Sequence, residues 1–228
     1  MENKKKTAHI AGAIYLLLAV TGMIGIMIIP SSIIVPESGA LTLANIAENP
    51  VLFKLGILCR FACQVAFIFL VLMLYRLFAD VDAFHAVLMV VLVMVSIPFT
   101  LALELTQVAL LALAVGEPYS TQLDSQTLSG MAQLSTGVFD YGIFLVGYYW
   151  GLWLLPFGIL VYKSGFIPRI FGILLVISFC AYITDSTVYV LLPGISAAVS
   201  NITAIFAAAG EFSILLWLLI AGIRKPAQ

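Results

Sequence analysis

Charged and amide side chains interrupt several long apolar runs of this sequence at helical spacing. Arg60 and Gln64 are four residues apart, so on a helix they lie one turn apart on the same face. Thr100, Glu104 and Gln107 form a second such face in another apolar run. Because lipid hydrocarbon offers no water to a charge, ionisable groups in such runs are expected to pair or to face a polar cavity. We therefore predict that Glu104 is the partner of Arg60.

More carboxylates and tyrosines occur in the second half of the chain. Tyr182 and Asp185 lie three residues apart and share a face of a predicted helix. Glu211 stands in the segment FAAAGEFS, whose small residues let neighbouring helices approach closely. Asp140 stands near the start of a further apolar run. Carboxylates in such places are typical of proton and ion pathways through a membrane.

The deep charges do not balance. Three acids, Glu104, Asp185 and Glu211, accompany one base, Arg60. The excess negative charge is relieved if a carboxyl group stays protonated, if water enters, or if a cation binds, and each solution needs a polar cavity. We expect an outward-facing cavity lined by Arg60, Gln64, Glu104, Gln107, Asp140, Tyr182, Asp185 and Glu211. In the alternative, these groups are structural: Arg60 with one carboxylate fixes helix register, and Asp185 bonds only to neighbouring tyrosines.

The composition is that of a membrane protein. Of the 228 residues, 63% are hydrophobic and 9% are charged, and the mean hydropathy is +1.17. A soluble domain carries about 25% charged residues. The three cysteines lack Cys-x-x-Cys spacing and the chain has two histidines, so we expect neither a disulfide framework nor a zinc centre. No metal or other cofactor is predicted.

A helix needs about 20 apolar residues to cross a bilayer, and the sequence can be divided accordingly. The six predicted spans cover approximately residues 7–29, 52–78, 85–115, 138–162, 169–192 and 202–223. The basic start followed by an apolar run is similar to a secretory signal, but the run is too long for a signal core, so we interpret it as the first span. The expected fold is all-α, with residues 1–228 forming one integral membrane domain of six helices.

The distribution of Lys and Arg predicts the orientation. Most basic residues fall at the ends or turns of one side, which the positive-inside rule assigns to the cytoplasm. These residues are Lys4, Lys5, Lys6, Arg76, Lys163, Arg169, Arg224 and Lys225. Both chain ends are then cytoplasmic, and the longer loops, 30–51 and 116–137, face outward. The outer loops carry the acids Glu37, Glu48, Glu117 and Asp124.

Several local signals predict turns and helix contacts. ALTLANIAEN, limited by Pro50, fits a short interfacial helix, and DSQTLSGMAQLSTG fits another that leads into the fourth span. In the alternative, both segments are ordered or mobile connectors. Gly165 lets the backbone leave the fourth span, and Pro168 suits the start of the fifth. In the fourth span, glycines repeat on one face, which is typical of close helix packing. They are Gly147, Gly151 and Gly158.

The sequence resembles a family of bacterial inner-membrane proteins that is known only as a domain of unknown function, DUF4386. The likeness is carried by GLWLLPFG at Gly151–Gly158, by SGFIPR at Ser164–Arg169, and by Gly172 and Tyr182 after it. The opening IAGAIYLLLAVTGMIG, residues 10–25, is similar too. The resemblance implies a compact multi-helix membrane protein, and it implies no activity, substrate or catalytic residue.

Three classes of function fit the sequence. The first is a carrier or binding protein for a small molecule, proton or cation. Two groups of three spans would have opposite orientation, as inverted repeats do, with Glu104 and Glu211 on corresponding helices, although no sequence repeat supports this. The second is a non-catalytic accessory protein that binds a lipid or a partner. The third, and the least favoured, is an acid-dependent intramembrane enzyme in which Asp140 and Asp185 share a proton.

Other classes are not supported. A serine protease needs a Gly-x-Ser motif together with a deep histidine, and His85 lies at the inner edge of its span. The basic residues are those that set the topology, so no patch remains for nucleic acid. No glycine-rich phosphate loop follows a strand, so nucleotide binding is not expected. The expected partner is the lipid bilayer, and the sequence does not predict an oligomeric state.

Overall fold

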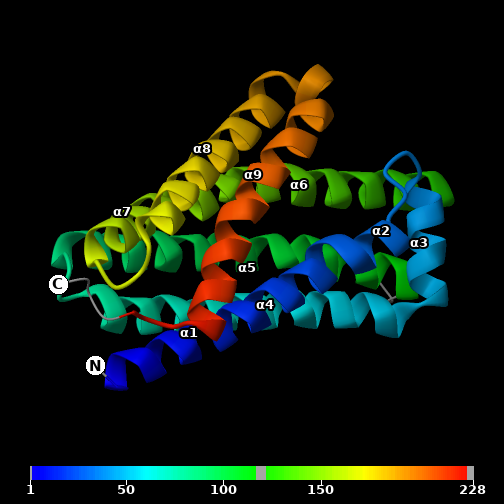
Figure 1. The fold of residues 1–228 in the computed structure, drawn as a ribbon. Helices are drawn as coiled ribbons and strands as arrows, with labels where there is room; N and C mark the ends of the chain where they lie inside the picture. The colour runs from blue at the N-terminus through cyan, green and yellow to red at the C-terminus, as the bar shows by residue number, and fades with distance from the viewer. Residues whose placement is uncertain (1, 117–121, 225–228) are drawn as a thin grey trace. The chain divides into compact units, whose positions relative to one another are not determined.

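The structure is a computed structural model that describes residues 2–116 and 122–224 of the chain. All regular elements among these residues are helical (Figure 1). In chain order they are α1 (Glu2–Gly22), η1 (Met23–Ile28), α2 (Ile29–Ile33), α3 (Gly39–Glu48), α4 (Pro50–Phe78), α5 (Ala83–Val115), α6 (Ser125–Leu152), α7 (Leu154–Ser164), α8 (Arg169–Leu191) and α9 (Pro193–Ile220). The all-α prediction is confirmed.

Six helical stretches of the described residues are long and apolar enough to cross a membrane. They are Glu2–Ile33, Pro50–Phe78, Ala83–Val115, Ser125–Ser164, Arg169–Leu191 and Pro193–Ile220. Each contains most of one predicted span, so the number and order of the spans agree with the sequence analysis. The chain is a multi-pass membrane protein whose apolar helices contact the lipid bilayer.

The sequence predicts a continuous helix for the first span, but the structure interrupts its regular α-helical turns. Residues Met23–Ile28 form a π-helix, in which the N–H of Ile29 bonds to the carbonyl of Ile24. The next residue, Pro30, has no N–H and its ring would collide with the carbonyl one α-turn earlier. The wider π turn immediately before Pro30 avoids that collision. The helix then continues to Ile33, beyond the predicted end.

The fourth span is also interrupted, against the prediction of one continuous helix. α6 ends at Leu152, and α7 begins at Leu154 after a turn at Trp153. Pro156 explains the break, because a proline has no N–H and its ring clashes with the carbonyl four residues earlier, that of Leu152. The backbone is carried across the break by bonds from Trp153 N–H to Tyr149 O, 3.2 Å, and from Phe157 N–H to Trp153 O, 3.3 Å.

Two of the predicted loops are largely helical. α3 occupies much of 30–51, where the sequence predicted a short helix, and Ser38 caps it by accepting the N–H of Leu41. In 116–137, α6 begins at Ser125 and runs into the fourth span without a break, so the expected separate helix is part of that span. Glu117 lies outside the described residues.

The connection between the last two spans is far shorter than predicted. Residues 193–201 lie outside both predicted spans, whereas α9 begins at Pro193 and Leu192 alone separates it from α8. Proline is well suited to the first turn of a helix, where its missing N–H costs nothing. Leu191, Leu192 and Ile195 at this tip are largely exposed. α8 and α9 lie side by side as an antiparallel hairpin (Figure 1).

The contacts divide the chain into two units, and the division falls within α1, α4, α5 and α6. Unit 1 comprises Met1–Leu17, Ala66–Ile97 and Phe144–Gln228, and unit 2 comprises Leu18–Val65 and Pro98–Ile143. Each unit is described separately below.

Unit 1 has an aromatic core and close glycine contacts. Trp153 packs against Phe67 and Phe157, with ring centroids 5.1 and 5.3 Å apart. A Cβ built on Gly158 would lie 2.8 Å from the carbonyl oxygen of Gly172, so α7 and α8 touch through their backbones. Gly147 and Gly151 likewise face α8. The prediction that the glycine face serves helix packing is confirmed at these three positions.

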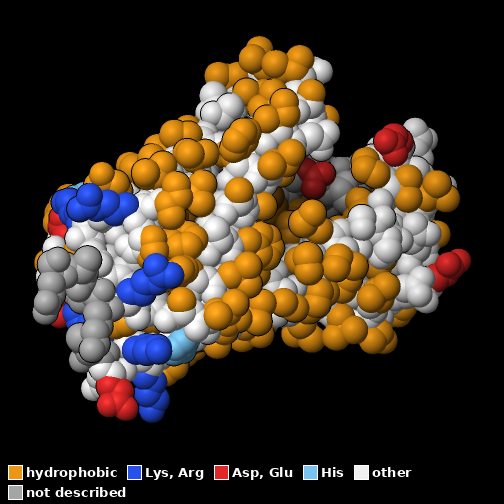
Figure 2. Space-filling model, viewed as in Figure 1, with side chains coloured by type: hydrophobic (Ala, Val, Ile, Leu, Met, Phe, Trp, Pro, Cys, Tyr) orange, Lys and Arg blue, Asp and Glu red, His pale blue; other side chains and the backbone are white. Residues whose placement is uncertain are grey.

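The polar end of unit 1 joins both ends of the chain to two turns. Lys4 pairs with Asp80 at 3.1 Å, and the backbone N–H of Arg224 bonds to Phe166 O at 2.8 Å. Basic side chains gather beside the chain ends, whereas hydrophobic side chains cover the helices (Figure 2). The first and last described helices therefore have their terminal ends at the same end of unit 1. That this end faces the cytoplasm stays a prediction, and Lys225 lies outside the described residues.

Asp82, in the turn between α4 and α5, holds the polar end together. Its carboxylate lies 2.7 Å from Lys163 Nζ and 2.9 Å from His85 Nδ1. The hydrogen bond from Lys163 and the contacts with His85 hold the pKa of Asp82 well below its usual range. Gly165 ends α7 in the left-handed region at φ 69°, as its position in the sequence predicts, and α8 starts directly after Pro168.

Unit 2 contains α2, α3 and the adjoining parts of four longer helices. A core of buried apolar side chains includes Ile33, Ile46, Phe53 and Leu110. Thr42 ties α3 to the segment before it, because its hydroxyl contacts both the N–H and the carbonyl of Val35, at 2.9 and 3.1 Å. The polar groups described next lie in the membrane-spanning part of this unit.

Candidate functional sites

The predicted pair of Arg60 and Glu104 is present in unit 2. Arg60 Nε donates to both carboxylate oxygens of Glu104, at 2.8 and 3.0 Å. The two residues are 2% and 8% exposed, so little water reaches the pair. Removing one partner of such a pair leaves an uncompensated buried charge, which is strongly destabilising. The pair therefore favours the helix register in which Arg60 of α4 meets Glu104 of α5.

The π-helix supplies a second partner for Arg60. Its Nη1 donates to the carbonyl oxygen of Gly25 at 2.7 Å. Position 25 has little room for a side chain, since a Cβ there would lie 2.7 Å from Arg60 Cγ and 3.0 Å from Gly56 O. The ring of Phe139 lies 5.2 Å from Arg60 Cζ, which is a cation–π distance. The guanidinium is thus held by three helical segments at once.

The same cluster contains two polar atoms without a hydrogen-bond partner in the part of the chain that the structure describes. Arg60 Nη2 and Gln64 Oε1 are both inaccessible and have no hydrogen-bond partner among the described residues. Gln64, Thr100 and Gln107 are all buried, as is Glu104. The sequence-predicted polar faces of the second and third spans therefore point into unit 2 rather than towards lipid. We call Arg60, Gln64, Glu104 and Gly25 the arginine cluster.

A second buried cluster lies in unit 1 and is centred on Glu211 of α9. Tyr15 of α1 donates to Glu211 Oε2 at 2.7 Å, and Tyr182 of α8 donates to Oε1 at 2.8 Å. Tyr15 is 1% exposed, and its ring lies 6.3 Å from that of Trp153 at the break between α6 and α7. Among the described residues, none of the ion pairs includes Glu211. We call Tyr15, Tyr182 and Glu211 the tyrosine cluster.

Two further polar residues of α8, Ser178 and Asp185, form hydrogen bonds to α9. Ser178 donates to the carbonyl oxygens of Phe206 and Ala207, at 3.1 and 3.2 Å, which fixes the hairpin near its middle. The hydroxyl of Ser200 donates to Asp185, so the suggestion that Asp185 bonds only to neighbouring tyrosines is wrong. That suggestion overlooked residues 193–201, which are helical and bring Ser200 alongside α8.

The eight predicted site residues fall into two groups. Arg60, Gln64, Glu104, Gln107 and Asp140 belong to unit 2, and Tyr182, Asp185 and Glu211 belong to unit 1. Within these groups, the structure joins Arg60 to Glu104 and Tyr182 to Glu211. Asp140 is exposed and is not part of the ion pair. A single outward-facing cavity that contains all eight stays a prediction.

Sequence reasoning missed Tyr15, Gly25 and Phe139. Tyr15 could have been found, because it carries a hydroxyl in the middle of the first apolar run and a buried tyrosine usually needs a hydrogen-bond partner. Gly25 and Phe139 offer no comparable signal. A carbonyl that is turned towards an arginine, or a ring that covers it, depends on helix contacts that the spacing of residues does not encode.

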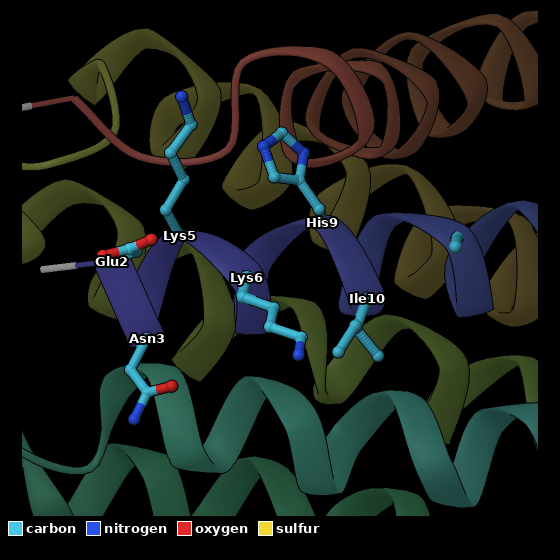
Figure 3. A pocket seen from close by; sticks show the side chains of 7 residues that line it. Glu2, Asn3, Lys5, Lys6, His9 and Ile10 are labelled. Carbon is cyan, nitrogen blue, oxygen red and sulfur yellow. The ribbon is translucent and has the colours of Figure 1, made fainter.

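An open pocket of about 900 Å³ lies beside α1 at the polar end of unit 1. It is lined by Glu2, Asn3, Lys5, Lys6, His9, Ile10 and Ala13. Lys5 and His9 point to the same side of α1, towards the end of α9, and Lys6 and Ile10 point to the other (Figure 3). His9 is held there by Leu219 O, 2.9 Å from its Nδ1. The pocket contains none of the predicted site residues.

The spans and the two buried clusters define a class: an all-α multi-pass membrane protein with ionisable groups inside its helices. The chain belongs to a family described as "Domain of unknown function (DUF4386)", whose model matches residues 10–222. The resemblance found in the sequence is thereby confirmed. No curated protein and no solved structure matches the chain.

Proposed function

We propose that the protein binds a proton or a small cation at Glu211 and uses this site to handle a small molecule or cation at the membrane. One observation carries the proposal. Glu211 lies within a membrane-spanning helix, both of its oxygens accept tyrosine hydroxyls, and no ion pair among the described residues includes it. A carboxylate at that depth needs a counter-charge or a proton, and ionisable groups in spans are by default functional.

The tyrosine hydroxyls favour exchange of the counter-charge over a permanent partner. Each hydroxyl can donate to a carboxylate or accept from a carboxylic acid, so the cluster keeps its hydrogen bonds in either protonation state. A fixed salt bridge such as the Arg60–Glu104 pair cannot do this, because protonation of the acid would strand the base. The break at Trp153 beside Tyr15 adds irregular backbone next to the cluster, which is a common feature of transporter sites.

The proposed activity also has a membrane and an orientation. The Lys and Arg distribution supports an orientation with both chain ends in the cytoplasm, and the family resemblance supports a bacterial inner membrane. With that orientation, the polar cavity opens outward. An acid-dependent enzyme gains no support, because Asp185 is engaged by Ser200.

Proton exchange at Glu211 is tested by pH-difference infrared spectroscopy of the protein in lipid nanodiscs. We expect a carboxyl band that appears on acidification, is suppressed by Na⁺ or K⁺ if a cation competes, and is lost in Glu211→Gln. The matched control is Glu48→Gln, which alters an exposed acid of α3 and should keep the band. A wild-type spectrum with no such band and no cation effect, identical to that of Glu211→Gln, would contradict the proposal.

A second candidate function, an accessory protein that binds lipid, is favoured by the pocket beside α1. Its basic groups Lys5, Lys6 and His9 adjoin the apolar Ile10 and Ala13, a combination that fits an anionic lipid headgroup and the start of its acyl chain. Native mass spectrometry with phosphatidylglycerol and phosphatidylcholine tests it. A preference for the anionic lipid that is lost in Lys5→Gln/Lys6→Gln supports lipid binding, and equal retention of both lipids rejects it.

A further inference from the structure

The two unsatisfied atoms of the arginine cluster belong to residues that share one face of α4. Arg60 Nη2 is a donor and Gln64 Oε1 is an acceptor, and their residues are four apart on α4. Leaving a buried polar atom unpaired costs about 1–3 kcal/mol, and more for a charged group. We propose that Arg60 and Gln64 together bind a hydroxyl group, that of a water molecule or of a small neutral polyol.

The pairing of donor and acceptor selects the chemistry. The guest has to accept a hydrogen bond from the Arg60 guanidinium and donate one to the Gln64 amide oxygen. A hydroxyl group does both at a single oxygen atom. A chloride ion or a carboxylate only accepts, so it would leave Gln64 Oε1 unsatisfied. An ammonium ion only donates and would be repelled by Arg60.

The local charge also favours a neutral guest. Arg60 and Glu104 compensate each other at 2.8 Å and are both buried. A further anion beside them would add an unbalanced negative charge where little water can solvate it, and a further cation would add a positive one. A neutral hydroxyl satisfies both atoms without changing the charge of the cluster.

The surrounding contacts hold the binding atoms in place before a guest arrives. Glu104 holds Arg60 Nε, the Gly25 carbonyl holds Nη1, and the Phe139 ring lies against the guanidinium. Nη2 has no hydrogen-bond partner among the described residues, so it is available to a ligand. Binding atoms whose rotamers are fixed by neighbouring groups lose little entropy when the ligand binds.

This inference goes beyond the proposed function and does not depend on it. No step involves Glu211, and the arginine cluster lies in unit 2 whereas Glu211 lies in unit 1. Glu211 can gain and lose a proton whether or not the arginine cluster holds a guest. The arginine cluster can likewise bind a hydroxyl group if Glu211 does not titrate.

The direction in which Gln64→Leu changes the melting temperature distinguishes a site that holds a guest from an empty one. If Gln64 Oε1 bonds to a guest, Gln64→Leu removes that bond and should lower the melting temperature in nanodiscs by about 2–4 °C. If the site is dry, the same variant removes an unpaired buried acceptor and should leave the melting temperature unchanged or raise it, which would overturn the proposal. Gln126→Leu, at an exposed position of α6 in the same unit, is the matched control.

Radiolytic footprinting detects the water form of the guest directly, because hydroxyl radicals that form at buried water oxidise adjacent rings. Phe139 is 7% exposed and lies against Arg60, whereas Phe53 is 2% exposed and lies in the apolar core of the same unit. We expect Phe139 to be oxidised well above Phe53 in the wild type, and this labelling to fall towards the level of Phe53 in Gln64→Leu.

Additive titrations identify the other guests. If glycerol raises the melting temperature of the wild type more than that of Gln64→Leu, the guest is a polyol, whereas equal glycerol effects together with Phe139 labelling identify water. Stabilisation of both proteins by chloride over gluconate would show an anion site and overturn the neutral guest. Phe139 labelling no higher than that of Phe53, with no difference in the glycerol effect, would also overturn it.

Discussion

The arginine cluster and the tyrosine cluster solve the same problem in opposite ways. Glu104 is neutralised by Arg60, with which it forms two short contacts, whereas Glu211 is held by two tyrosine hydroxyls without a basic partner among the described residues. The first arrangement fixes a charge pair in place, because neither group can change its charge without stranding the other. The second tolerates gain or loss of a proton. The difference separates a structural and binding role from a titrating one.

The largest expected effect comes from breaking the charge pair. Glu104→Gln leaves Arg60 buried without a counter-ion and should lower the free energy of unfolding by about 3–5 kcal/mol. Glu211→Gln strands no base, so we expect it to cost about 1 kcal/mol. Chemical denaturation of both variants in the same mild detergent measures the difference. Equal decreases in the free energy of unfolding would show that Glu104 and Glu211 are not neutralised in different ways.

A smaller effect is expected from removing the tyrosine hydroxyls. Tyr15→Phe and Tyr182→Phe each delete one hydrogen bond to Glu211 and should cost about 1–2 kcal/mol each. Because the remaining hydroxyl still contacts the carboxyl group, each variant should also shift the pH at which the infrared band appears, without removing it. Tyr141→Phe, at an exposed position of α6, is the control. An unshifted band in both variants would show that the hydroxyls do not set the protonation of Glu211.

The smallest effect concerns the ion pairs of Asp82 with Lys163 and His85 at the polar end, which sharpen the comparison with the two buried clusters. The pKa of Asp82 is held below its usual range by Lys163 and His85, so its ionised form stabilises the folded state above the ordinary carboxyl pKa. That contribution should be lost as the pH falls from about 5 towards 2. Asp82→Asn should therefore show a flatter acid-side stability profile than the wild type. Profiles of the same slope would contradict this role.

The sequence predicts the buried pair because a strong physical rule applies to it. Arg60 is a deep base in an apolar run, and hydrocarbon makes an isolated ion so costly that a deep acid had to be its partner. The polar faces around Gln64 and Thr100 follow from helical spacing alone. The same rule does not find the tyrosine cluster, since it requires the first, fifth and sixth spans to meet at Tyr15, Tyr182 and Glu211.

The irregular parts of the helices were less predictable. Pro30 and Pro156 are visible in the sequence, but a proline within an apolar run can end a helix, kink it or widen a turn, and tertiary packing decides among these outcomes. The start of α9 was misplaced because residues 193–201 have small and polar side chains that are typical of a loop. Their helical conformation is stabilised by packing along α8, which includes the bond between Ser200 and Asp185.

The single-residue link at Leu192 has a consequence for the way the chain enters the bilayer. A connector that short leaves no stretch of polar chain to thread through the translocation channel between one helix and the next, so α8 and α9 should be released into lipid as a preformed pair. The leucines and the isoleucine at its tip are largely exposed, so the tip presents apolar side chains to its surroundings. A connector of one residue gives soluble proteases no extended loop to cleave.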